Sequence, residues 1–271
     1  MQQHAPIHLF KYRGIIDRLG EAAVQSKETL LAASGNDEIY YTPFEWTNPQ
    51  AKLVVVGITP GPTQLQMAYR TVSSKIKVGL DDEGILKAAK EHGAFGGATM
   101  RPNLVRMMEH FGFAELFGVD IVEDFWGKSA DVFMGTSVVP HAAFRRGKPF
   151  AGSFDDIMKT NVLTECFLYD FVPSLKDVPD DAKFVALGET PLRALAWCVR
   201  YGHLKESQVM GAFAHPSTSG GSAVDAYLGL KTRFDPKDPV RNRVDRLRMF
   251  YNGMNTRVEA MRAERALVPS L

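Results

Sequence analysis

The pattern of apolar residues divides this chain into short runs that end at glycine or proline. The first run, Leu53 to Val56, is mostly β-branched and does not alternate with polar residues, which is typical of a strand buried on both faces of a parallel sheet. It stops at Gly57-Ile58-Thr59-Pro60-Gly61-Pro62, where two prolines lack N–H donors and two glycines open unusual backbone angles. We expect a buried strand that ends in a stiff turn. The plainest alternative is a strand-to-helix connection without chemistry.

Three further apolar runs have the same form, over residues 132–139, 183–187 and 208–213. They end at Pro140-His141, at Gly188 and at Ala214-His215-Pro216, and helical patterns separate them. Strands that alternate with helices predict a parallel sheet with helices on both faces. The carboxyl ends of such strands are where open α/β sheets bind their ligands.

Apolar residues at helical spacing mark most of the remaining chain. The first such segment covers residues 7–33, and we expect it to end at Ser34-Gly35-Asn36-Asp37. Residues 65–100 show no clear period. No linker or repeat divides the chain, so we expect one domain over residues 1–271, with a core of about 50–225 and helical extensions at both ends. The other predicted helices cover Arg101–Gly112, residues 154–169, Pro191–Arg200 and Val240–Met261.

Composition narrows the class of protein without naming a function. Hydrophobic residues make up 45% and charged residues 23%, as in ordinary globular proteins. The 32 Lys and Arg nearly balance the 31 Asp and Glu, so any nucleic-acid-binding face must be local. Cys166 and Cys198 are too few for a disulfide framework or an iron–sulfur cluster, and we interpret them as core thiols. No apolar run of about 18 residues and no signal-peptide pattern occurs, so we expect a cytoplasmic protein without a membrane partner.

Several common catalytic motifs are missing from the sequence. There is no P-loop, and the Gly57–Gly61 turn lacks the spacing of a dinucleotide site. There is no H-E-x-x-H, C-x-x-C or G-x-S-x-G either, and the seven histidines are scattered. We therefore expect a pocket at the strand ends that uses no metal and no cofactor.

Two motifs at opposite ends of the predicted core resemble the signature motifs of the uracil-DNA glycosylase superfamily. They are Gly57-Ile-Thr-Pro-Gly-Pro62 and His215-Pro-Ser217, and the first is nearest to the G-x-N-P-G form of the mismatch-specific and single-strand-selective monofunctional branches. Thr136-Ser-Val-Val139 resembles the strand that carries the base-reading Asn in that superfamily. Ala186-Leu-Gly188, followed by a helix, is similar to its third-strand region. The resemblance spans roughly residues 50–225.

The resemblance implies a fold and an activity. The fold is a three-layer α/β/α sandwich with a central, mainly parallel four-stranded sheet. The activity is hydrolysis of the N-glycosidic bond of a uracil or modified pyrimidine flipped out of DNA, by a monomer without cofactors. His215 would donate a hydrogen bond to the departing base, whose carbonyl oxygen becomes negative in the transition state. The alternative for His215 is a histidine that only caps a loop.

The resemblance also assigns a substrate pocket. Thr59 is the candidate that orients the attacking water, and Ser137 stands where the base-reading Asn would be. Phe95 is the candidate stacking ring, although a core phenylalanine is the alternative. The first motif also contributes Gly57, Ile58, Pro60 and Gly61. His141 is a further candidate, because it directly follows the second predicted strand.

Two departures from the family pattern leave the substrate open. Thr59 replaces the Asn or Asp of the first motif, and a hydroxyl can orient water but cannot act as its base near neutral pH. Ser137 is shorter than Asn and reads a base edge less strictly, so plain uracil need not be the preferred base. Other carboxylate or amide groups that could act on water are Gln64, Asp81, Asp82 and Glu83, each of which is more often a solvated surface group.

Basic residues near the predicted pocket are candidates for DNA binding, with a solvated helix face as the alternative. The second function hypothesis is a DNA-binding member of the same superfamily that has lost catalysis. A role in repair and a role in defence against modified viral DNA both remain open. The candidate DNA contacts are Arg145, Arg146, Lys148, Ser217, Thr218, Ser219, Lys231 and Arg233.

Overall fold

A computed structural model describes residues 7–217 and 222–266 of the chain. Contacts between Cα atoms group the chain into two compact units, each described here by itself. The first unit contains residues 1–49, 56–97 and 134–179, and the second contains residues 50–55, 98–133 and 180–271. The single domain expected from the sequence remains a prediction.

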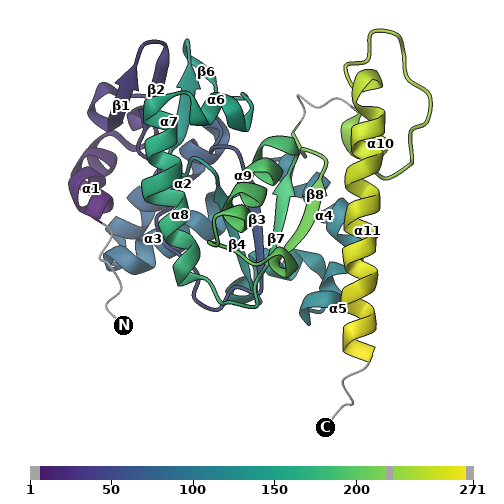
Figure 1. Cartoon of the computed structure of the whole chain (residues 1–271). Coiled ribbons are helices and arrows are strands. Elements are labelled where there is room, and N and C mark those ends of the chain that lie inside the picture. The colour runs from purple at the N-terminus through teal and green to yellow at the C-terminus, as the bar shows by residue number, and fades with distance from the viewer. Residues whose placement is uncertain (1–6, 218–221, 267–271) are drawn as a thin grey trace. The chain divides into compact units, whose positions relative to one another are not determined.

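The four apolar runs form a four-stranded parallel sheet (Figure 1). Its strand order is β4-β3-β7-β8, and parallel pairing joins Val185 to Gly211 and Leu187 to Phe213 in the last two strands. Every residue of β3 is buried, as its unbroken apolar run predicts. The mixed α/β class is therefore confirmed. The strands are β3 Leu53–Gly57, β4 Phe133–Ser137, β7 Lys183–Leu187 and β8 Val209–Phe213.

The first unit contains a second, antiparallel sheet that the sequence pattern did not predict. Its strand order is β1-β2-β5-β6, and Asp37 lies opposite Arg145 in the pairing of β2 with β5. Each strand is only two to five residues long, so its periodic signal is weak. Two of the pairings are local hairpins, but the pairing of β2 with β5 joins segments about 100 positions apart. The strands are β1 Leu30–Ser34, β2 Asp37–Tyr40, β5 Ala142–Arg145 and β6 Lys148–Pro149.

The prediction of one helix over residues 7–33 is wrong in its second half. Helix α1 covers Ile7–Leu19 and is followed by 3₁₀ turns at Gly20–Ala23 and Lys27–Thr29. Gly20, at φ +55°, takes a left-handed backbone conformation that suits the end of a helix. Leu30 to Ser34 then form strand β1, because pairing with β2 outweighs the helical preference of leucine and alanine. The Ser34–Asp37 segment is accordingly a hairpin turn.

Residues 65–100, which show no clear period in the sequence, contain most of two helices. Helix α2 covers Pro62–Lys77 and α3 covers Asp82–Gly93. Proline suits the first position of α2, where an N–H would have no partner within the helix. The rest of the unit is helical from residue 154 onward, as expected for residues 154–169. Its elements are α6 Phe154–Met158, α7 Asn161–Glu165, the π-helix η5 Cys166–Phe171, α8 Val172–Ser174 and the 3₁₀ turn η6 Leu175–Asp177.

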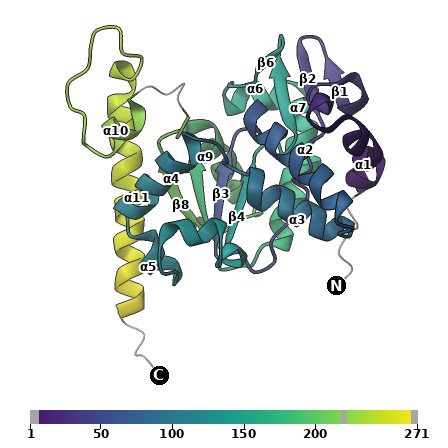
Figure 2. The same cartoon turned by 180° about the vertical axis from the view of Figure 1, so that it is seen from behind.

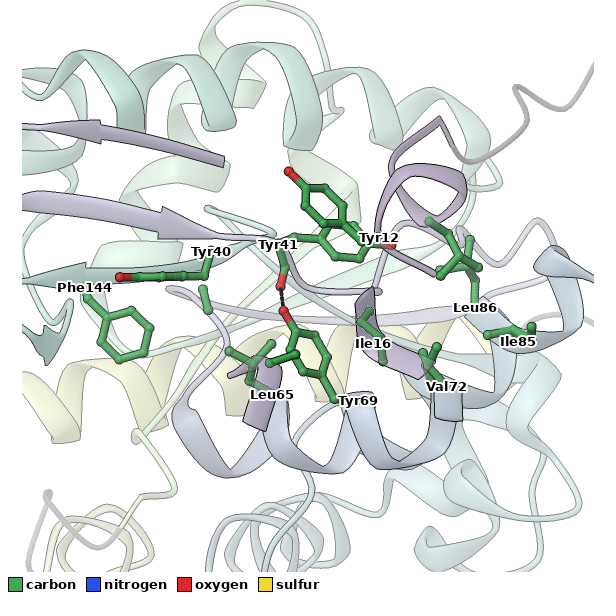
Figure 3. Close-up of a cluster of buried hydrophobic side chains, with 14 residues drawn as sticks. Tyr12, Ile16, Tyr40, Tyr41, Leu65, Tyr69, Val72, Ile85, Leu86 and Phe144 are labelled. Atoms are coloured by element: carbon green, nitrogen blue, oxygen red, sulfur yellow. Dashed lines mark hydrogen bonds between the residues drawn. The ribbon is translucent and has the colours of Figure 1, made fainter. Parts of the chain in front are cut away.

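The hydrophobic core of the first unit gathers tyrosines as well as aliphatic residues (Figure 3). Tyr12 stacks on Tyr41 with ring centroids 4.4 Å apart. The Tyr69 hydroxyl donates a hydrogen bond to the Tyr41 carbonyl at 2.6 Å, so this buried phenol has a partner. Residues from α1, α2, α3, β2 and β5 meet in this core.

The second unit places its helices around β7 and β8 (Figures 1 and 2). The long C-terminal helix α11, Val244–Ala266, packs on β8 and buries Leu247, Met254 and Val258, as its apolar stripe predicts. Gly211 in β8 faces this helix, and its φ of +129° lies in the region that favours glycine. The other helices and turns are α4 Met100–His110, α5 Phe113–Phe117, η3 Val122–Trp126, η4 Ala130–Val132, α9 Glu189–Arg200, η7 Glu206–Gln208, α10 Ala223–Tyr227 and η9 Arg241–Arg243.

Among the helices of residues 7–217 and 222–266, none combines the length and the apolar character needed to cross a bilayer.

Candidate functional site

Three of the predicted pocket residues lie together in the first unit. Gly57 ends β3, Ser137 ends β4, and Phe95 follows α3. A Cβ built on Gly57 would lie 3.2 Å from Cε1 of Phe95 and 3.4 Å from Oγ of Ser137. The structure therefore brings the first residue of the first motif, the base-reading position and the candidate stacking ring within contact distance.

Phe95 is held in an unusual backbone conformation. Its φ of +53° lies in the left-handed region, which bulky residues rarely occupy. Its ring also lies against β4, because a Cβ on Gly135 would be 2.9 Å from Cε2 of Phe95 and 2.8 Å from Cβ of Ala94. Only 4% of Phe95 is exposed. Phe95 therefore combines a rarely adopted backbone conformation with a buried ring that lies against two glycines.

Thr59 is tied to the segment that follows β4. Its hydroxyl donates a hydrogen bond to the His141 carbonyl at 2.7 Å and accepts one from the Ala143 N–H at 2.9 Å. The single hydrogen of the hydroxyl is thus in use, and one lone pair remains. Thr59 can accept a hydrogen bond from a water but cannot donate one without breaking the first bond.

The turn after β3 continues the pairing of β3 with the β4 segment and then leads into helix α2. The N–H of Val138 donates to the Gly57 carbonyl and that of Val139 to the Ile58 carbonyl, both at 2.9 Å. The side-chain carbonyl of Gln64 accepts from the Gly61 N–H at 3.3 Å. Pro60 is buried, and Ile58 and Gly61 are partly exposed. The turn is therefore a fixed loop with a small accessible surface.

His141 lies in the interior and not at an open strand end. It is 3% exposed, and its Nδ1 accepts a hydrogen bond from the Thr42 N–H at 3.2 Å. Burial, with a smaller contribution from the nearby His8, lowers the pKa of His141 to about 3. The ring is therefore neutral at neutral pH, and its hydrogen is on Nε2.

His8, His141 and Asp170 are the described residues that come nearest to a metal-binding arrangement. One ligand atom from each lies within 4.8 Å of the others. Because Thr42 occupies the Nδ1 lone pair of His141, the hydrogen on Nε2 leaves that ring without a lone pair for an ion. In this hydrogen-bonding pattern the three side chains do not offer three ligand atoms.

His215 belongs to the second unit, at the end of β8. Its Nδ1 lies 2.9 Å from Oγ of Ser217 and 3.3 Å from the Ser217 backbone nitrogen, whose N–H donates to it. This contact places the hydrogen of the neutral ring on Nε2. Burial lowers the pKa of His215, which also favours the neutral ring. His215 is therefore set up as a neutral hydrogen-bond donor.

Asn103 is a residue that sequence reasoning missed. Its Nδ2 donates a hydrogen bond to the Pro216 carbonyl at 3.0 Å and so fixes the His215–Ser217 segment to helix α4. Gly188, at φ +90°, lies on the other side, where a Cβ would be 3.9 Å from Cβ of His215. This partly buried Asn gives no signal in the sequence, because its partner lies more than 100 positions away.

Two of the predicted DNA-binding residues of the first unit line a surface pocket of about 510 Å³, together with Lys159. The Arg145 guanidinium holds Asp37 through Nε at 2.7 Å and Nη2 at 3.2 Å. Arg146 is exposed, and so is Lys148, which lies opposite Arg145 in the β5–β6 pairing. Among these cations, Arg145 is partly neutralised.

The predicted DNA contacts of the second unit differ in their exposure and in their partners. Lys231 forms an ion pair with Asp238 at 2.8 Å, and Arg233 is exposed. Ser217 bonds to His215, as described above. Thr218 and Ser219 lie outside the described residues.

Three of the four additional candidates for activating water have structural roles. Gln64 is buried and holds the Gly61 N–H, and Asp81 accepts from the Gly84 N–H at the start of α3. Asp82 pairs with Arg13 at 2.5 Å. Glu83 is exposed. The sequence prediction that these groups are solvated is wrong for Gln64, which is 5% exposed.

A buried acid and a buried base lie close to each other in the first unit. Burial raises the pKa of Glu45 to about 8 and lowers the pKa of Lys90 to about 7. Lys90 donates to the Trp46 carbonyl at 2.5 Å, and one carboxylate oxygen of Glu45 lacks a hydrogen-bond partner within the part of the chain that the structure describes. Neither residue gave a sequence signal, because only tertiary contacts bury them.

A search of known protein families finds no match for this chain. Among curated proteins, the chain is similar to the uncharacterized protein YoxB of Bacillus subtilis (strain 168), with 29% identity over 198 residues. The match covers 73% of this chain and 77% of YoxB. The name of this relative gives no activity, so the function is argued from the residues of the site.

Proposed function

We propose that this protein is a monofunctional DNA glycosylase of the uracil-DNA glycosylase superfamily. It would hydrolyse the N-glycosidic bond of a flipped-out uracil or modified pyrimidine. The observation that carries the proposal is the contact between Gly57, Phe95 and Ser137, three residues that the motif resemblance assigns to one base pocket. The proposal includes a specific fold, a three-layer α/β/α sandwich in which the parallel sheet is the central layer.

The chemistry assigns each residue one task. Water adds to C1′ of the sugar while the C1′–N bond breaks. The electron pair of that bond leaves with the base, and the proton lost by the water ends on the released base through solvent. Negative charge then develops on a carbonyl oxygen of the base. The Nε2–H of a neutral His215 would donate to that oxygen, an interaction that strengthens only as the bond breaks. Phe95 would stack on the base, and Ser137 would bond to its edge.

A base-release assay tests this proposal. Oligonucleotides that contain uracil, a thymine mismatch, hydroxymethylcytosine or glucosylated hydroxymethylcytosine are incubated with the protein, and free base is measured by mass spectrometry. We expect release of at least one base, and a loss on the order of 100-fold in the single-turnover rate for His215→Ala. The exposed His203 provides a matched control, since His203→Ala should keep the full rate. No release from any substrate by a protein that still binds DNA would contradict the proposal.

The clamped hydroxyl of Thr59 favours a second candidate function, a DNA-binding member without catalysis. Its hydrogen is committed to the His141 carbonyl, and a hydroxyl is no base near neutral pH. This candidate predicts salt-dependent DNA binding that His215→Ala leaves unchanged, with no base release under any condition.

A further inference from the structure

Three turns of the first unit enclose the surface pocket of about 510 Å³. They are the β1–β2 turn at residues 34–37, the β5–β6 turn at residues 145–148 and the turn between α6 and α7 at residues 159–161. Three cations line the pocket and one carboxylate does so. A pocket with this surplus of positive charge suits an anion.

The single carboxylate of the lining does not cancel this charge. Asp37 is buried and is held by the guanidinium of Arg145, which also donates to Oγ1 of Thr160 at 3.2 Å. Asp156 lies near Arg145 and Lys159 but is held by the backbone N–H and hydroxyl of Ser153, at 2.8 and 2.7 Å. Arg145 is therefore a fixed wall of the pocket, and the exposed side chains of Arg146 and Lys159 supply its net charge.

Arg146 occupies a position that another residue would fill at lower cost. It has φ +53° and the following Gly147 has φ +70°, so both central residues of the β5–β6 hairpin turn are left-handed. Such turns favour Asn-Gly, because asparagine tolerates this region better than longer side chains do. The Arg146 N–H also donates to the Asn36 carbonyl at 2.8 Å, which fixes the turn against the β1–β2 turn. The turn geometry alone therefore does not account for an arginine at position 146.

We propose that this pocket binds a phosphate group, with Arg146 and Lys159 as its direct contacts and Arg145 as a fixed third cation. A guanidinium and an ammonium together suit the bidentate and point-charge recognition of phosphate oxygens. The exposed amide of Asn36 and the hydroxyl of Ser34 stand at the rim as further donors. The phosphate belongs to a nucleic-acid strand or to a free nucleotide, and the volume of the pocket accommodates either.

The proposal goes beyond the glycosylase function and does not require base release. Its test therefore measures binding and uses DNA without any modified base. The variant Arg146→Asn removes the cation and places a preferred residue in the turn, so it should bind less tightly while its thermal unfolding midpoint stays equal or rises. Opposite changes in affinity and stability separate a lost contact from a damaged fold.

The nucleic-acid arm of the experiment uses fluorescence anisotropy with a labelled duplex and a labelled single strand. We expect the double variant Arg146→Asn with Lys159→Gln to bind at least tenfold more weakly. The slope of log affinity against log salt should also fall by about 1.8 on duplex DNA, at about 0.9 per lost phosphate contact. Lys176→Gln, an exposed lysine outside the pocket, is the matched control and should bind as the native chain does.

The free-phosphate arm measures the thermal unfolding midpoint with millimolar inorganic phosphate or adenosine monophosphate, against chloride at equal ionic strength. A rise that the double variant abolishes, with no change in its oligonucleotide binding, assigns the site to a free phosphate group. Unchanged oligonucleotide affinity together with no phosphate-dependent rise would overturn the proposal.

Discussion

Single residues of the first unit hold the Phe95 ring in place. Gly57 and Gly135 leave the space that the ring edge fills, at distances where a Cβ would touch it. Neither glycine has a positive φ, so steric room and not backbone freedom explains them. Substitutions at these two glycines therefore test how tightly the Phe95 ring is held.

Gly135→Ala should destabilise the protein by about 1–3 kcal/mol, because its Cβ would meet Ala94 at 2.8 Å and Phe95 at 2.9 Å. Urea unfolding measures the loss. Gly14→Ala is the matched change, since nothing lies within 4 Å of that exposed position in α1 and alanine favours helix. It should stabilise by about 0.5–1 kcal/mol. If the two substitutions change the free energy of unfolding equally, the Phe95 ring moves aside without a measurable cost.

The buried carboxyl of Glu45 makes stability depend on pH. Burial raises the pKa of Glu45 from its ordinary value of 4.5 to about 8 in the folded chain. Between those values the folded state binds the extra proton, so the free energy of unfolding falls as pH rises. Glu45→Gln removes this titrating group. The difference in the free energy of unfolding between the native chain and the variant should therefore change by a few kcal/mol, in order of magnitude, from pH 5 to pH 7. Denaturant titrations at each pH measure this free energy. If it changes with pH equally in the native chain and the variant, the raised pKa of Glu45 is contradicted.

At the scale of elements, helices fix the segments that carry the motifs. Helix α2 begins directly after the first motif, and Gln64 from its first turn holds the Gly61 N–H. Helix α4 holds the His215–Ser217 segment through Asn103, and Ser217 sets the hydrogen position on His215. Each motif is therefore short in sequence but is shaped by a helix.

Asn103→Ala should free the His215–Ser217 segment and cost about 1 kcal/mol of stability through the lost hydrogen bond. Base release should slow, but by less than for His215→Ala, because the donor itself remains. Asn252→Ala, at an exposed position of α11, serves as the control for both measurements. A native rate in Asn103→Ala would show that the bond to Pro216 is only structural.

At the scale of the whole molecule, the chain passes between the two units five times, at residues 49/50, 55/56, 97/98, 133/134 and 179/180. Neither unit is therefore a continuous stretch of sequence that could fold during synthesis before the rest. Strands β3 and β4 each contribute residues to both groups. This connectivity favours cooperative unfolding of the chain as one body, as the single-domain prediction requires.

Tryptophan fluorescence can follow each unit separately. Trp46 belongs to the first unit, and Trp126 and Trp197 belong to the second. Trp46→Phe leaves reporters only in the second unit, and the double variant Trp126→Phe with Trp197→Phe leaves one in the first. We expect the fluorescence midpoint in urea to coincide with that of far-ultraviolet circular dichroism for each variant. A fluorescence transition displaced from the circular dichroism of the same variant would instead show two domains.

The elements with long apolar runs were predictable from the sequence, whereas several elements without such a run were missed. Strands β3, β4, β7 and β8 and helix α11 each carry a strong period or an unbroken run, so local sequence is sufficient. Helices α2 and α3 were missed although their buried residues recur at helical spacing, as Leu65, Ala68, Tyr69 and Val72 do on α2. Strand β1 was assigned to a helix, since its partner in the hairpin decides its conformation.

The sequence by itself determined the four buried strands, the two end motifs and the candidate residues Gly57, Phe95, Ser137 and His215. It did so because apolar runs and fixed turn residues act over a few positions. Only the tertiary structure decided that Phe95 reaches Gly57 and Ser137, that Thr42 and Ser217 set the hydrogens on His141 and His215, and that three turns form a basic pocket. Those features join segments up to about 100 residues apart, and contacts at that separation leave no pattern in a single chain.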